Sequence, residues 1–131
     1  MAPEAQDERT QAGSVSSAIS NAVRQLLADY TGRGPTRART SIRDNLVVVL
    51  LEDTLTKGER RLVHKGRDYR VIDYRREFQE AMRDDAIASI EELTGRKVMA
   101  FMSANHIDPD LAAELFVLEP EPDGARGDGA R

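Results

Sequence analysis

The 131-residue sequence predicts an α+β fold: two consecutive αββ units form a four-stranded, largely antiparallel sheet with helices packed on one face. Thr-Gly-Arg occurs twice, at residues 31–33 and 94–96, each time after a segment with helical periodicity. Each copy is followed by a strand-like segment, a polar turn and an apolar segment ending in Leu-Glu. This repeated order indicates an internal duplication, and two αββ units supply the four strands of one sheet.

The first predicted helix covers residues 14–30. Ser14 or Ser16 is suited to cap its start. Its apolar residues recur at steps of three and four, the spacing of one helix face, and they are Ile19, Val23, Leu26, Leu27 and Tyr30. Gly32, Gly34 and Pro35 follow directly, which is typical of a helix end.

A β-hairpin is predicted next. Residues 36–43 alternate in character, residues 46–52 form a β-branched apolar run, and Asp44-Asn45 between them has turn chemistry. A two-residue loop would pair Arg37 with Glu52 and Arg43 with Leu46.

The second unit begins with a short extra helix. Thr56-Lys57-Gly58-Glu59 has the spacing of a capping box, and the helix that it starts ends near Gly66. A long helix follows over residues 67–93. Gly95 ends it, and strands at 97–103 and 111–118 flank a loop at 105–110. The apolar face of the long helix consists of Val71, Phe78, Met82, Ala86, Ile90 and Leu93.

Length and composition fit a single folded domain over residues 14–119, with disordered tails at 1–13 and 120–131, the second one acidic. The absence of cysteine excludes disulfides, thiolate nucleophiles and sulfur-ligated zinc sites. No apolar run has the length of a membrane span and no signal peptide is visible, so we expect a cytoplasmic protein, with attachment to the inner face of the membrane left open. A net charge of −4 argues against nucleic-acid binding.

One face of the predicted hairpin is the candidate site for an anion or a partner. Arg37, Arg39, Ser41 and Arg43 lie there beside the aliphatic residues of the second strand, and Arg33 precedes them. Guanidinium groups suit carboxylate, phosphate or bicarbonate oxygens, although solvation or pairing with acidic neighbours such as Glu52 is the more usual role of exposed arginines. Because a strand that is apolar on both sides is normally covered on both, we favour a homodimer through this face.

Catalysis has no support in the sequence. A Gly-x-Ser-x-Gly elbow is absent, and the hypothesis of a hydrolase using His106 with Asp108 or Asp110 remains a remote alternative. The acidic residues of the long helix are typical of a solvated face, so we expect no metal and no cofactor. The turn at 31–35 follows a helix, unlike phosphate-binding loops, which precede one.

Four segments resemble a bacterial family, MpsC, named for the C component of a Na+-translocating membrane potential-generating system. They are YTGRGPTRAR at 30–39, LEDTLTKGE at 51–59, IEELTGRK at 90–97 and FMSANHIDPD at 101–110. The resemblance implies an accessory or regulatory protein of a system related to inorganic-carbon (bicarbonate) uptake, acting by protein or small-anion binding beside a membrane transporter complex, without inserting into the membrane. A purely structural homodimeric adaptor is the alternative hypothesis.

Overall fold

The computed structural model describes the backbone of residues 3–120 and the side chains of residues 13–120. The element order is α1 (Pro3–Thr31), β1 (Arg37–Arg43), β2 (Leu46–Glu52), α2 (Lys57–His64), α3 (Asp68–Thr94), β3 (Val98–His106) and β4 (Leu111–Leu118). These bounds confirm the two predicted αββ units and the short helix between them.

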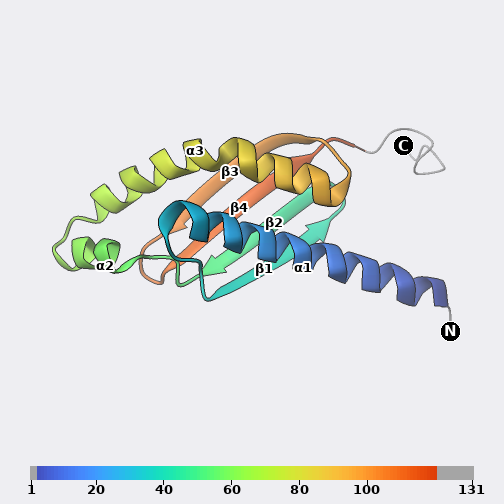
Figure 1. The fold of residues 1–131 in the computed structure, drawn as a ribbon, viewed down its shortest axis with the longest axis horizontal. Helices are drawn as coiled ribbons and strands as arrows, with labels where there is room; N and C mark the ends of the chain where they lie inside the picture. The colour runs from blue at the N-terminus through green and yellow to red at the C-terminus, as the bar shows by residue number, and fades with distance from the viewer. Residues whose placement is uncertain (1–2, 121–131) are drawn as a thin grey trace.

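The four strands form one sheet in the order β1-β2-β4-β3, in which every neighbouring pair is antiparallel. The order is symmetric about the β2–β4 junction, as expected of two duplicated αββ units. Helices α1 and α3 lie side by side across one face of the sheet, whereas α2 lies beyond its end (Figure 1). The predicted fold class is therefore confirmed. Helix α2 lies between β2 and α3, before the helix of the second unit.

The first hairpin has the predicted register. Arg37 pairs with Glu52, Arg39 with Leu50 and Arg43 with Leu46. Asp44 turns the chain with a φ of 55°, a left-handed conformation that Asp tolerates better than most residues. The register therefore separates the arginine side of β1 from the side that faces the helices.

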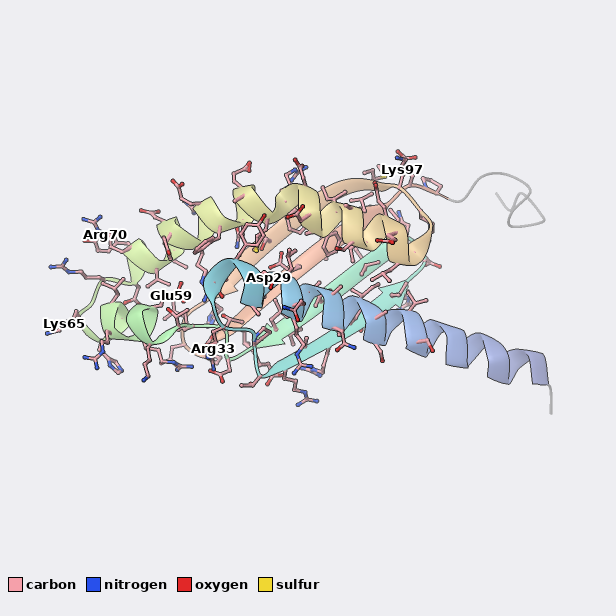
Figure 2. The ribbon with its side chains drawn as sticks, viewed as in Figure 1. Asp29, Arg33, Glu59, Lys65, Arg70 and Lys97 are labelled. Atoms are coloured by element: carbon pink, nitrogen blue, oxygen red, sulfur yellow. The ribbon has the colours of Figure 1, made fainter. Side chains whose placement is uncertain are left out.

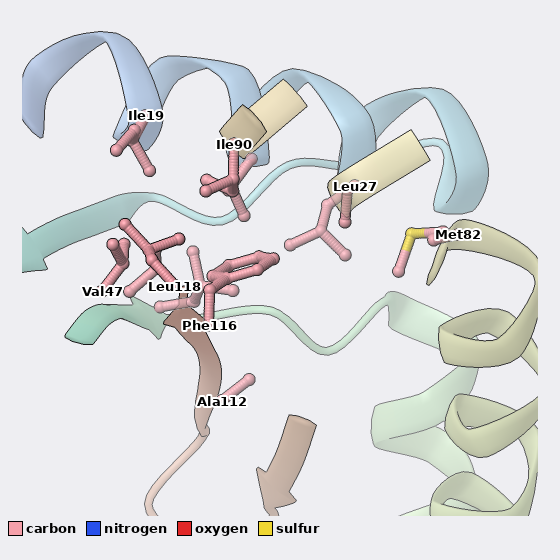
Figure 3. Packing of buried hydrophobic residues seen from close by; sticks show 12 residues of the cluster. Ile19, Leu27, Val47, Met82, Ile90, Ala112, Phe116 and Leu118 are labelled. Carbon is pink, nitrogen blue, oxygen red and sulfur yellow. The ribbon is translucent and has the colours of Figure 1, made fainter. Parts of the chain in front are cut away.

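The hydrophobic core lies between the sheet and the two long helices. Figure 3 shows the Phe116 ring at the centre of the core cluster, with Ile90 of α3 and Leu27 of α1 close to it. Val47, Val49 and Leu51 of β2 are fully buried beneath the same helices, and the long helix contributes four of the six residues predicted for its apolar face as buried side chains. This core fixes which sheet face is left uncovered.

Both Thr-Gly-Arg copies form the same helix end. Thr31 and Thr94 each donate a hydroxyl hydrogen bond of 2.7 Å to the carbonyl four residues earlier. Gly32 and Gly95 follow with φ values of 82° and 71°, and the backbone N–H of each donates a 2.8 Å hydrogen bond to a helix carbonyl. The sequence repeat thus corresponds to a structural repeat.

Two boundaries differ from the prediction. Helix α1 begins at Pro3, whereas the sequence analysis placed residues 1–13 in a tail. Residues 3–13 lack apolar periodicity but contain strong helix formers such as Glu4, Ala5 and Gln6, and proline suits the first helical turn. Strand β3 continues to His106, so the connecting loop is shorter than predicted. The predicted acidic tail, apart from Pro120, lies outside the described residues.

Candidate functional site

The sheet side opposite α1 and α3, which we call the open face, is an apolar surface that the helices of this chain do not cover. Side chains alternate across a strand and paired residues share a side, so the register assigns the open face. It consists of Arg37, Arg39, Ser41 and Arg43 from β1, Leu46, Val48, Leu50 and Glu52 from β2, Leu111, Ala113, Leu115 and Val117 from β4, and Ala100, Met102, Ala104 and His106 from β3.

No residue of the open face is buried, although its two central strands are almost entirely aliphatic. Leu46 retains 37% of its accessible surface and Met102 retains 50%. On the other side of the same strands the residues that alternate with these are covered by the helices. Both sides of β2 and β4 are therefore apolar, but only one side is packed.

The predicted arginines Arg37, Arg39 and Arg43 form a row along the β1 edge of the open face, together with Ser41. Glu52 lies within reach of two of them: its Oε2 is 3.9 Å from Arg37 Nε and 3.5 Å from Arg39 Nη2. These contacts are long and exposed, so each adds little to stability. The row is a solvated cationic edge that Glu52 neutralises in part.

Arg33 has a different environment from the row. Its guanidinium donates hydrogen bonds to the Asp53 carbonyl at 2.5 Å, the Asp53 carboxylate at 2.7 Å and the Leu55 carbonyl at 3.3 Å. The hydrogen bond from Arg33 is the main influence that holds the pKa of Asp53 below its ordinary value. Arg33 therefore braces the segment after β2, and its donors point there rather than into an anion site with Arg37.

A buried polar cluster that was not predicted from the sequence lies at the junction of α2, α3 and the sheet. Arg75 of α3 and Glu59 of α2 are each 5% exposed. The Arg75 Nε donates to Glu59 Oε2 at 2.8 Å, and Nη2 donates to Oε1 at 2.7 Å. The remaining donors reach the Thr54 carbonyl, the Thr54 hydroxyl and the Asn105 amide oxygen at 2.7, 3.3 and 3.4 Å. All five N–H groups of Arg75 thus have an acceptor.

Asp110 organises the neighbouring loop. Its Oδ1 accepts hydrogen bonds from the backbone N–H and the hydroxyl of Thr54, and its Oδ2 accepts one from the backbone N–H of Leu55, each 3.0 Å long. Arg60 of α2 lies between the carboxylates of Asp53 and Asp110. The loop before α2 is therefore held by a carboxylate from the β3–β4 turn, which lies at the same end of the sheet.

Glu114 is a further buried carboxyl group, on the core side of β4 directly opposite Ser103 of β3. Burial raises its pKa to about 7, against the influence of the Ser103 hydroxyl and of the charge of Arg75. Beside it is a cavity of about 10 Å³ lined by Arg75, Asn105 and Glu114 among others, about the space that one water needs. This cavity is too small for a substrate.

The sequence contains a weak sign of this cluster. The predicted apolar face of α3 jumps seven residues, from Val71 to Phe78, and Arg75 occupies the skipped position. Glu114 likewise alternates with Ala112 and Phe116 on the core side of its strand. A charged residue at a core position indicates a partner, but the sequence does not reveal which one.

The other features considered in the sequence are His106, a metal site and a membrane-spanning segment. His106 lies at the open face, and its Nδ1 is 2.8 Å from the Pro109 carbonyl oxygen. Among the described residues, no group of three or more His, Cys, Asp or Glu side chains is arranged to hold a metal ion. Within residues 3–120, no helix combines the length and the hydrophobicity needed to cross a bilayer.

Comparisons with known proteins agree with the resemblance of the four motifs. An uncharacterized protein of Bacillus subtilis (strain 168), YrhF, is 28% identical over 111 residues, which cover 77% of this chain and 84% of the relative. No solved structure matches the chain significantly. The family described as "Na+-translocating membrane potential-generating system (MpsC)" matches residues 11–120, and the chain therefore belongs to this family.

Proposed function

We propose that this chain is a non-catalytic accessory protein of a membrane potential-generating system and that it acts as a homodimer whose interface is the open face. Family membership supports the link to such a system. The non-catalytic role rests on the sequence, which offers no nucleophile with a general base beside it.

The observation that carries the proposal is the unpacked apolar side of β2 and β4. Sheets whose central strands are apolar on both sides are normally covered on both, and the helices of this chain cover one. Leu46 and Met102 would lose much of their exposed surface in such a contact. A contiguous apolar surface of this kind marks a protein interface more often than a solvated face.

A second copy of the chain suits this face because the face is nearly self-complementary. A twofold axis parallel to the strands would stack the two apolar centres and place β1 of each copy over β3 of its partner. The arginine row would then meet Met102, Ala104 and His106 rather than another arginine row. The aliphatic stems of Arg37 and Arg39 can cover such residues while their guanidinium groups stay in water.

Small-anion binding is the second candidate function. If the anion were bicarbonate, this function would relate the protein to inorganic-carbon uptake. Three guanidinium groups stand in a row on β1, and Arg43 forms no ion pair within the described part of the chain. Bicarbonate, phosphate or a carboxylate would raise the melting temperature if it bound the native state. Arg37→Ala and Arg39→Ala would abolish that rise. Glu52 already neutralises part of the row, which favours the interface over the anion.

Sedimentation equilibrium tests the interface. The wild-type chain is expected to be a dimer at micromolar concentration, and Leu50→Arg, which places a charge at the centre of the open face, is expected to be monomeric. Ala88→Arg on the exposed side of α3 adds the same charge elsewhere and should leave the dimer intact. A monomeric wild type, or a dimeric Leu50→Arg variant that retains its fold by circular dichroism, would contradict the proposal.

A further inference from the structure

The end of the molecule formed by α2, the following turn and the start of α3 (residues 57–70), here called the basic end, has a charge opposite to that of the whole chain. It contains six Lys or Arg residues and two acidic residues, whereas the chain as a whole has a net charge of −4. Figure 2 shows Lys65 and Arg70 at this end, pointing away from the body of the protein. The remainder of the chain is therefore strongly acidic.

Most charges of the basic end are exposed and available. Lys57, Arg61, Lys65 and Arg67 are exposed, and none of them forms an ion pair within the described residues. One of the two acidic residues, Glu59, is buried and neutralised by Arg75. The outward field of this end is thus strongly positive.

Apolar side chains are exposed among these charges. Leu62 of α2 retains 36% of its accessible surface, and Tyr69 at the start of α3 retains 59%. Arg70 lies over the Tyr69 ring, 5.5 Å from its centroid. Lysine and arginine around leucine and tyrosine are typical of segments that lie at a membrane–water interface.

The basic end is also held in a fixed orientation. Helix α2 lies between β2 and α3 in the chain, and beyond the end of the sheet in space (Figure 1). Its link to the core is the buried Arg75–Glu59 pair, and Arg60 adds contacts to Asp53 and Asp110. The ion pairs of Glu59 and Arg60 thus attach α2 to the rest of the protein, and the side chain of Leu62 stays exposed to solvent.

We infer that the basic end is a docking surface for an anionic lipid bilayer. The end has an open pocket of about 700 Å³ between α2 and α3, lined in part by Leu62 and Arg70. Around it the end combines unpaired cations with exposed leucine and tyrosine side chains, which suits an anionic headgroup layer. The acidic remainder would be repelled from the same surface, so that the charge asymmetry also orients the molecule. This inference does not depend on the dimer proposed above.

Vesicle co-sedimentation tests the surface directly. The full chain is expected to bind vesicles in which phosphatidylglycerol replaces about a third of the phosphatidylcholine, and to remain in solution with pure phosphatidylcholine. High salt should release it, because the attraction is screened within a Debye length. Equal binding to neutral vesicles, or no binding to anionic ones at low salt, would overturn the inference.

Paired charge reversals locate the surface. Arg61→Glu with Lys65→Glu should weaken vesicle binding by at least about tenfold, because each basic residue near an anionic surface contributes about fivefold. Lys97→Glu with Arg83→Glu changes the net charge equally at exposed positions outside the basic end and should have a much smaller effect. Equal losses in both variants would show a nonspecific charge effect and would contradict the surface.

A tryptophan reporter adds an independent measurement, since the chain contains no tryptophan. Tyr69→Trp should show a blue shift of its emission on anionic vesicles, whereas a tryptophan that stays in water would contradict apolar contact at Tyr69. The monomeric Leu50→Arg variant should still bind vesicles, which separates this inference from the dimer. Binding of single-stranded RNA or of an acidic polypeptide in place of vesicles, at equal ionic strength, would identify a different partner and overturn the lipid assignment.

Discussion

Arg75 of α3 and Glu59 of α2 join two helices through a pair of parallel hydrogen bonds, Nε to Oε2 at 2.8 Å and Nη2 to Oε1 at 2.7 Å, in the protein interior. The Glu59 carboxylate also accepts a 2.8 Å hydrogen bond from the Thr56 backbone N–H and so completes the capping box of α2. One carboxylate therefore starts the helix and fastens it to the core. The orientation of the basic end depends on this pair.

Removing the Glu59 charge should destabilise the fold. Glu59→Gln leaves the Arg75 guanidinium buried without a counter-charge, and breaking a buried ion pair costs about 3–5 kcal/mol. The free energy of unfolding, measured by urea denaturation, should fall by roughly 3 kcal/mol, whereas Glu77→Gln at an exposed position of α3 should change it by less than about 0.5 kcal/mol.

The same pair predicts a pH dependence. Burial acts to raise the pKa of Glu59, but hydrogen bonds from Arg75 and Thr56 outweigh it and hold the pKa below the ordinary 4.5. A lowered carboxyl pKa contributes stability above the unfolded-state value, and that contribution is lost as the pH falls through the folded-state value. The difference between wild type and Glu59→Gln should thus persist at neutral pH and shrink below about pH 4. A pH-independent difference would contradict this account.

Glu114 should give the opposite pH dependence. Burial raises its pKa to about 7, so the protonated form is favoured in the folded chain, and its contribution to stability is lost as the pH rises from 4.5 through 7. Glu114→Gln, which mimics the neutral acid, should be more stable than wild type by roughly 2–3 kcal/mol near pH 8 and nearly equal to it near pH 4.

Thermal unfolding across that pH range measures the effect. Glu92→Gln on the exposed side of α3 is the matched control and should show no such trend. If Glu114→Gln were less stable than wild type near pH 8, the charged carboxylate would have a favourable partner, and the assignment of a raised pKa would be wrong.

Local patterns were sufficient to predict the fold. The Asp44-Asn45 turn fixed the hairpin register, the Thr56–Glu59 spacing fixed the start of α2, and the two Thr-Gly-Arg copies marked both helix ends. Each of these features depends on residues that are only a few positions apart in the sequence, so it can be predicted from the sequence. The row of Arg37, Arg39 and Arg43 followed from the register.

The buried cluster could not be predicted in the same way. Arg75 forms hydrogen bonds with Glu59 and Asn105, which are sixteen and thirty residues away in the sequence. Asp110 accepts a hydrogen bond from Thr54, which is fifty-six residues away. Such partners meet only when the sheet brings β4 beside β2 and α3 folds back over it. The pairing of Arg33 with Asp53 could not be predicted for the same reason, because Asp53 lies after the hairpin.

Asp110 should be needed for the geometry of the loop before α2. Asp110→Asn replaces one acceptor oxygen with an NH₂ group that would face a backbone N–H of Thr54 or Leu55, and a buried donor left without an acceptor costs about 1–3 kcal/mol. Urea denaturation should show a loss in that range. Asp108→Asn, an exposed neighbour in the same turn, should have little effect, and equal losses would mean that overall charge rather than hydrogen bonding matters.

Gly95 should be required for its backbone conformation alone. Its φ is 71°, and a Cβ at this position would meet nothing within 4 Å, so the cost of Gly95→Ala is purely that of the left-handed backbone, about 1–2 kcal/mol. Gly58→Ala is a matched control, because Gly58 lies inside α2 with open space around it, and alanine there should be neutral or stabilising by about 0.5–1 kcal/mol. Urea denaturation distinguishes the two. A Gly95→Ala variant as stable as wild type would mean that α3 can end in another way, and the equivalent helix ends at Gly32 and Gly95 would not be a constraint on the duplicated fold.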